Sequence, residues 1–250
     1  MLQRLGLTLI LIISSLAEAS IVNQHKQSQL PTALEVVERH IQAVGGRAAW
    51  LKIKSQYTAG TIEVLDTDTK GTYEVYAKAP NRDLLIMKFA GGGGFKEGFD
   101  GQRSWSLSQK NGAQYDPPEK QTRNKRDADF YKYLHFKVHF PNAKVIGIEE
   151  VSGAKAYLIE ATPAGEKLSE RLYFDVRTGL LILRDTSQND ADGKKIPSMQ
   201  YCDDYRKVGE IKIAFSLRMI EGNTTIVTKD TEVKNNIALD NKIFNLPESK

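Results

Sequence analysis

From Lys54 onward, apolar and polar residues alternate along most of the chain, which is the pattern of β-strands with one buried face. Residues 211–219 are typical, because Ile211, Ile213 and Phe215 alternate with Lys212 and Ser216. Glycine, asparagine and aspartate turns, such as Asp100-Gly101, separate the alternating segments. Strands are therefore predicted over residues 54–65, 70–79, 82–90, 95–100, 103–108, 144–150, 155–162, 168–176, 180–187, 197–207, 210–220 and 223–234.

The region before these strands has helical spacing. Thr32 and Glu35 are placed as a capping box at a helix start. Gly45-Gly46 ends the helix, because glycine adopts the left-handed closing conformation easily. A second short helix is predicted over residues 47–53. The apolar stripe of the first helix consists of Leu34, Val37, Ile41 and Val44.

A break in the strand pattern follows Pro117-Pro118. Phe130, Tyr131, Leu134 and Val138 recur there at helical spacing, which predicts a helical insert near residues 127–139 that lies across the sheet. Closely spaced strands joined by short turns indicate an antiparallel meander. The predicted fold class is α+β, mainly β, and residues 31–250 are expected to form one domain.

Composition and net charge limit the classes of protein to which this chain can belong. The 250 residues are 40% hydrophobic and 26% charged, which favours a globular chain over a disordered one. The formal net charge of +4 is too small to indicate a nucleic-acid partner.

The first nineteen residues have the layout of a signal peptide. A charged start with Arg4 precedes a short apolar run, and Ala17 and Ala19 are the small residues of a cleavage site. Cleavage after Ala19 would leave a polar, flexible leader over residues 20–30 and a soluble periplasmic or secreted protein. The alternative is a retained membrane anchor, although the run is short for a bilayer span.

The single cysteine, Cys202, excludes an intramolecular disulfide. We expect a buried, inert thiol there, because no base for a nucleophile stands beside it in the sequence.

His135 and His139 share one face of the predicted helix, as two metal ligands would. Zinc normally takes at least three protein ligands, and neither His25 nor His40 forms a cluster with this pair. We therefore expect no metal site and no cofactor.

The remaining motifs do not indicate a nucleotide, calcium or catalytic site. The Gly91–Gly94 run lacks the ending of a phosphate loop, and residues 189–193 lack the ligands that complete a calcium loop. No catalytic constellation is recognised, so an enzyme is the less favoured class. The basic run from Lys120 to Arg126 could meet phosphate head groups, but a solvated charged loop is preferred.

Four segments carry a resemblance to a known family. They are Phe99–Trp105 (FDGQRSW), Tyr173–Leu180 (YFDVRTGL), Tyr201–Ile211 (YCDDYRKVGEI) and Asn236–Pro247 (NIALDNKIFNLP). Together with the order of elements over about residues 31–248, they resemble the outer-membrane lipoprotein-sorting proteins, the LolA/LolB-like family. The resemblance implies an unclosed β-barrel whose apolar concave face is covered by the N-terminal helix and the helical insert.

Members of that family hold acyl chains of lipids or lipoproteins in the cavity and carry them between membranes. The resemblance therefore implies a lipid or acylated lipoprotein ligand and a membrane-associated donor or acceptor. Phe130, Tyr131 and Leu134 would act as a lid. The other expected lining residues are Ile62, Val64, Tyr73, Val75, Leu85, Met87, Phe89, Trp105, Leu172, Phe174, Ile213, Phe215 and Leu217.

Three functions follow from these observations. The first is a soluble exported carrier or binding protein for an acylated ligand. The second is a non-enzymatic interaction module whose cavity is filled by its own side chains. The third and weakest is a hydrolase whose site is assembled from residues distant in sequence.

Overall fold

The computed structural model describes residues 30–189 and 195–248. The predicted signal peptide, nearly all of the leader and residues 190–193 of the segment that was compared with a calcium loop lie outside these residues. The chain divides after Pro31, and the fold described below is that of Thr32–Lys250. None of the helices in the described residues combines the length and the apolar character needed to cross a membrane.

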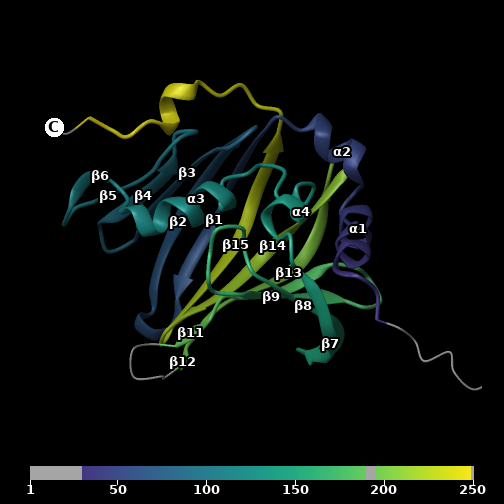
Figure 1. Ribbon diagram of the computed structural model, residues 1–250. Helices are drawn as coiled ribbons and strands as arrows, with labels where there is room; N and C mark the ends of the chain where they lie inside the picture. The colour runs from purple at the N-terminus through teal and green to yellow at the C-terminus, as the bar shows by residue number, and fades with distance from the viewer. Residues whose placement is uncertain (1–29, 190–194, 249–250) are drawn as a thin grey trace, which may run out of the picture. The chain divides into compact units, whose positions relative to one another are not determined.

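Within the described residues, thirteen strands form one antiparallel sheet that curls without closing (Figure 1). The strand order is β6-β5-β4-β3-β2-β1-β15-β14-β13-β10-β9-β8-β7, with β6 and β7 at the two ends. The bounds are β1 (Ser55–Val64), β2 (Thr69–Lys78), β3 (Arg82–Phe89), β4 (Gly94–Phe99), β5 (Ser104–Ser108), β6 (Gly112–Tyr115), β7 (Lys144–Val151), β8 (Ala154–Ala161), β9 (Glu170–Asp175), β10 (Leu181–Asp185), β13 (Ser198–Val208), β14 (Ile211–Glu221) and β15 (Thr224–Asn235). The short strands β11 (Gln188–Asn189) and β12 (Lys195–Ile196) pair separately.

The predicted fold class and every predicted strand are confirmed, with ends that move by one or two residues. Strand β6 was not predicted, because Gly112–Tyr115 is too short to show alternation. The sheet consists of two meanders, β1–β6 and β7–β15, which are joined where β1 pairs with β15 along Gln56↔Asn235 to Val64↔Ile226.

Helix α1 (Ala33–Ala43) begins with the predicted capping box, in which the Glu35 amide donates to Thr32 Oγ1 at 3.2 Å and the Thr32 amide donates to Glu35 Oε2 at 2.7 Å. Its predicted stripe is partly wrong, because Leu34 is 47% exposed while Val36 is buried. The second helix is confirmed as α2 (Arg47–Lys52). Helix α1 packs through Val36, Val37 and Ile41 onto a sheet face that includes Leu172 and Phe174.

The helical insert is built differently from the prediction. Helix α3 (Pro118–Asp127) spans the run that was interpreted as a charged loop, and only α4 (Phe136–His139) is helical within 127–139. Residues 128–135 form turns. Proline at the first position starts α3 at no hydrogen-bonding cost, and its polar sequence has no apolar stripe to reveal it.

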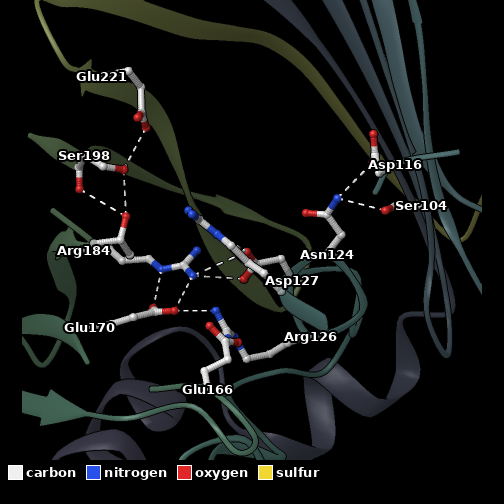
Figure 2. Close-up of polar contacts among 12 residues, drawn as sticks. Ser104, Asp116, Asn124, Arg126, Asp127, Glu166, Glu170, Arg184, Ser198 and Glu221 are labelled. Carbon is white, nitrogen blue, oxygen red and sulfur yellow. Dashed lines mark hydrogen bonds and ion pairs between the residues drawn. The ribbon is translucent and has the colours of Figure 1, made fainter. Parts of the chain in front are cut away.

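Helix α3 bridges strands that lie far apart in the sheet (Figure 2). Both contacts come from opposite sides of its last turn. Asn124 Nδ2 donates to Ser104 Oγ on β5 at 3.0 Å. Two residues later, Arg126 is ion-paired with Glu170 on β9 and with Glu166. Because Glu170, Leu172 and Phe174 alternate along β9, α3 lies on the same sheet face as α1 and α4 (Figure 1).

The opposite face of β3–β6 has its own cover. Trp105 and Leu84 pack there beneath Phe244 of the 3₁₀ turn η2 (Asn241–Phe244). The Trp105 indole donates to the Phe244 carbonyl at 2.7 Å. A second 3₁₀ turn, η1 (Leu65–Thr67), connects β1 with β2.

Candidate functional site

A cavity of about 270 Å³ lies between the helices α1 and α2, the turns of residues 129–134 and the strands β10, β13 and β14. Its volume is just under the usual range of about 300–1,000 Å³ for small-molecule sites. The lining residues are His40, Ile41, Val44, Trp50, Asp129, Phe130, Tyr131, Lys132, Tyr133, Leu134, Leu181, Arg184, Gln200, Cys202, Tyr205, Lys212, Ile213 and Ala214.

The turns that cover the cavity, residues 129–134, are held by backbone and side-chain hydrogen bonds. Asp129 Oδ1 accepts from the Tyr131 amide at 2.9 Å, and the Phe130 amide donates to the Pro80 carbonyl at 2.9 Å. Tyr131 Oη donates to the Ile53 carbonyl at 2.7 Å. These bonds hold the first half of the cover. At its last residue, the Leu134 carbonyl accepts a hydrogen bond from Arg47 Nη1 at 3.4 Å.

Lys132 is the unusual polar residue of the cavity. Burial lowers the pKa of its amine, an effect that the nearby Asp127 carboxylate offsets only in part. In the described part of the chain the amine forms no hydrogen bond or ion pair, and its Nζ lies 5.7 Å from the centroid of the Tyr133 ring. An ammonium group in this position favours an anionic partner.

Two further groups of the wall, His40 and Cys202, are neutral at pH 7. Burial lowers the pKa of His40 to about 4, and its Nδ1 donates to the Gly179 carbonyl at 3.1 Å. Burial also raises the pKa of the Cys202 thiol to about 11, which supports the interpretation of an inert thiol. The Trp50 indole nitrogen is buried without a hydrogen-bond partner among the described residues.

Of the residues expected to line a cavity, Phe130, Tyr131, Leu134 and Ile213 lie in the wall of this one. Phe130, Tyr131 and Leu134 are the residues that were assigned to a lid, and they come from turns rather than from a helix. Leu172 and Phe174 are buried on the same sheet face, but α1 and Phe136 of α4 pack against them.

Most of the remaining expected residues share one face of the sheet. Opposed residues of antiparallel strands point to the same side, and the register pairs Tyr73 with Met87 and Val75 with Leu85. Ile213 of the cavity wall lies on that side too, so the face continues outward from the cavity. The same reasoning across neighbouring strands adds Ile62, Val64, Phe89, Phe215 and Leu217.

Trp105 is a correction to the expected lining. It lies opposite Gly98, which in turn lies opposite Leu84, and both neighbours belong to the other face of the sheet. Its ring is 1% exposed and packs under Phe244. An alternating strand assigns two faces but does not say which one is concave, so the sequence alone could not place this residue.

A second cavity, of about 390 Å³, lies on the other side of Asp129. It is lined by polar groups that include His135, His139 and Glu166. The reasoning that left the two histidines without a third ligand was wrong, because Asp129 lies against both rings. The signal was present in the sequence as Asp129, six residues before His135, but only the turns between them bring the three together.

No protein-family model matches the sequence, and the comparison with curated proteins finds no match. Solved structures do match at the level of the fold. A LolA superfamily protein from Nitrosomonas europaea superimposes with a TM-score of 0.59 at 11% identity, over 86% of this chain and 98% of that one. This chain has the LolA-like fold.

Two further structures with high TM-scores agree. A DUF1329 family protein from Desulfovibrio piger matches with a TM-score of 0.58 at 12% identity, over 84% of this chain and 96% of that one. A putative outer membrane lipoprotein-sorting protein domain from Vibrio parahaemolyticus matches with a TM-score of 0.56 at 10% identity, over 85% and 95%. At these identities the LolA-like resemblance concerns the fold alone.

Proposed function

We propose that this protein is an exported, non-catalytic binding protein or carrier whose cavity holds the acyl chain of a lipid or acylated protein. The observation that carries the proposal is the cavity of about 270 Å³, whose cover is formed by Phe130, Tyr131 and Leu134. Burial of acyl chain would drive binding at about 0.8 kcal/mol per CH₂ group.

The polar end of the ligand would lie at Lys132. Its half-buried amine has no anionic partner within ion-pair distance in the described residues, so a carboxylate or phosphate group would supply one. Ion pairing with a ligand would also offset the cost of keeping this ammonium group away from water. The ligand class is therefore an anionic amphiphile.

The sheet face that continues from Ile213 would accommodate more than one acyl chain of the ligand. Tyr73, Met87, Val75 and Leu85 are apolar or amphipathic and lie side by side on it. A ligand with two or three acyl chains could extend from the cavity onto this face. The fold shared with a lipoprotein-sorting domain agrees with an acylated lipoprotein as cargo and a membrane-associated donor or acceptor.

The experiment is native mass spectrometry of protein purified from its own cell envelope, followed by organic extraction. We expect a co-purifying acyl species at a defined stoichiometry. A clean apo mass, together with no uptake of added fatty acid or phospholipid, would overturn the proposal and favour the interaction module with a self-filled core.

The cover is tested with a matched pair of variants. Leu134→Asp introduces a charge into the cavity wall, whereas Val138→Asp introduces the same charge four residues later at a side chain that is 72% exposed. We expect the first variant to lose fatty-acid uptake and the second to retain it. Thermal unfolding of both variants shows whether the fold is intact, and equal uptake by both would contradict the assignment of the cover.

A further inference from the structure

Asp129, His135 and His139 form a compact cluster at the two ends of the cavity cover. Asp129 Oδ2 lies 2.7 Å from His135 Nδ1 and 2.6 Å from His139 Nε2. One nitrogen of each ring and one carboxylate oxygen lie within 4.8 Å of one another. All three residues line the cavity of about 390 Å³, so the cluster is open to solvent on that side.

The donor set is that of a transition-metal site. Two imidazoles and one carboxylate are a common set of protein ligands for divalent first-row metals, with the remaining positions left for water or a ligand. The charge balance is favourable, since the neighbouring Arg126 is already ion-paired with Glu166 and Glu170. We propose that Asp129, His135 and His139 bind a divalent transition-metal ion of the zinc class.

Binding requires only a small adjustment of the side chains. With metal–ligand bonds of about 2.0–2.2 Å in tetrahedral geometry, the donor atoms must separate by about 0.7 Å from their hydrogen-bond distances. The His135 side chain is 49% exposed and has space to move, whereas His139 and Asp129 are 19% and 15% exposed and hold the other two positions. The fourth position then faces the cavity.

The affinity should be lower than that of a structural zinc site. Ligating histidines usually donate their second ring nitrogen to a carboxylate or carbonyl, and such partners raise affinity by about 10–100-fold. In residues 30–189 and 195–248 neither ring has a hydrogen bond from its second nitrogen. An exchangeable ion is therefore expected.

The position of the ion has a consequence for the cover. Asp129 precedes Phe130 and His135 follows Leu134, so the ion would join the two ends of the segment that lines the first cavity. Bound metal should slow opening of this segment and thus slow release of acyl ligand. This consequence rests on the proposed function, whereas the metal site itself does not.

The test is isothermal titration of zinc chloride into chelator-treated full-length protein, with His135→Gln, His139→Gln and Asp129→Asn as variants. We expect one zinc ion per chain in the wild type and a loss of affinity of about 100-fold or more in each variant. His135→Gln is the decisive variant, because this exposed ring contributes least to packing. His25→Gln is the matched control and should bind as the wild type does.

Cobalt(II) gives a second readout, because visible absorption of high intensity reports low-symmetry coordination by protein ligands. We expect this absorption in the wild type and in His25→Gln and its loss in His135→Gln. Equal zinc affinity in the wild type and His135→Gln, or no binding in the wild type, would overturn the metal site. Zinc binding with unchanged release of fatty acid would overturn only the link to the cover.

Discussion

Arg184 on β10 donates two hydrogen bonds to Glu170 on β9, from Nε to Oε2 at 2.8 Å and from Nη2 to Oε1 at 3.0 Å (Figure 2). The side chains are 14% and 6% exposed. Helix α3 adds Asp127, whose Oδ1 lies 3.1 Å from Arg184 Nη2, and Arg126, which is ion-paired with Glu170. This buried network joins the helical insert to the sheet beside the candidate cavity.

Replacing Glu170 with alanine should destabilise the protein by about 3–5 kcal/mol, because two buried arginines would lose their shared carboxylate. The free energy of unfolding by urea measures the change. The matched control is Glu210→Ala, which breaks an exposed ion pair with Lys52 of the same 2.8 Å length. That change should cost less than about 1 kcal/mol, and equal costs for the two variants would contradict a structural role for the network.

The buried His40 should make stability depend on pH. Burial lowers its pKa to about 4, whereas the pKa of an exposed histidine is 6.5. Between these values the unfolded state binds a proton that the folded state does not, so the contribution of His40 to stability is present above pH 6.5 and is lost as the pH falls. The loss should approach about 3 kcal/mol near pH 4.

The measurement is the free energy of unfolding from pH 4 to 8 for the wild type and for His40→Gln. Comparing the two proteins cancels the other titrating groups. We expect the advantage of the wild type to shrink steadily below pH 6.5. Parallel curves would contradict a neutral, buried His40.

Lys132→Met should distinguish the contribution of the ligand's anionic head group to binding from that of its acyl chain. Removing the amine should weaken binding of a fatty acid by about tenfold or more and leave a fatty alcohol of the same length unaffected. Displacement of a fluorescent fatty acid measures both affinities. Lys125→Met, at an exposed lysine of α3, is the control and should change neither; a loss of alcohol binding in Lys132→Met would indicate a general effect on the cavity.

Gly45 ends α1 where the chain passes the start of β14. Its φ is +118°, and a Cβ there would lie 2.5 Å from the Glu210 carbonyl oxygen. Gly45→Ala should therefore cost about 3 kcal/mol of stability, from backbone strain and overlap together. Gly209→Ala also has a positive φ, +64°, but meets nothing within 4 Å and should cost about 1 kcal/mol. Thermal unfolding distinguishes the two, and similar losses would contradict the close approach.

Local pattern predicted much of the fold because strands and capped helices leave signals within a few residues. Alternation revealed the strands from β1 to β15 apart from β6, β11 and β12, and Thr32 with Glu35 located the start of α1. Helix α3 left no such signal, because its residues are almost all polar and only Arg126 is buried. Its helix depends on contacts with Ser104 and Glu170, which the sequence places far away.

The candidate site shows the same division. The resemblance to the lipoprotein-sorting family implied a cavity lined by residues that include Phe130, Tyr131, Leu134 and Ile213, and these four lie in the wall of one. Lys132 and the Asp129–His135–His139 cluster were not expected in their present roles. Burial of an amine and convergence of three ligands depend on how the turns fold back on the sheet, which no local period encodes.

The sequence by itself determined the strands, their antiparallel hairpins and the first helix, because period-two alternation, turns and caps act between near neighbours. The pairing of β1 with β15, which joins the two meanders, was decided only by the tertiary structure. Only the tertiary structure decided which face of the sheet is covered, as the placement of Trp105 shows. It also decided that α3 bridges β5 and β9 and that the Lys132 amine lies in the cavity wall. These features depend on long-range packing, in which residues distant along the chain set each other's burial and charge.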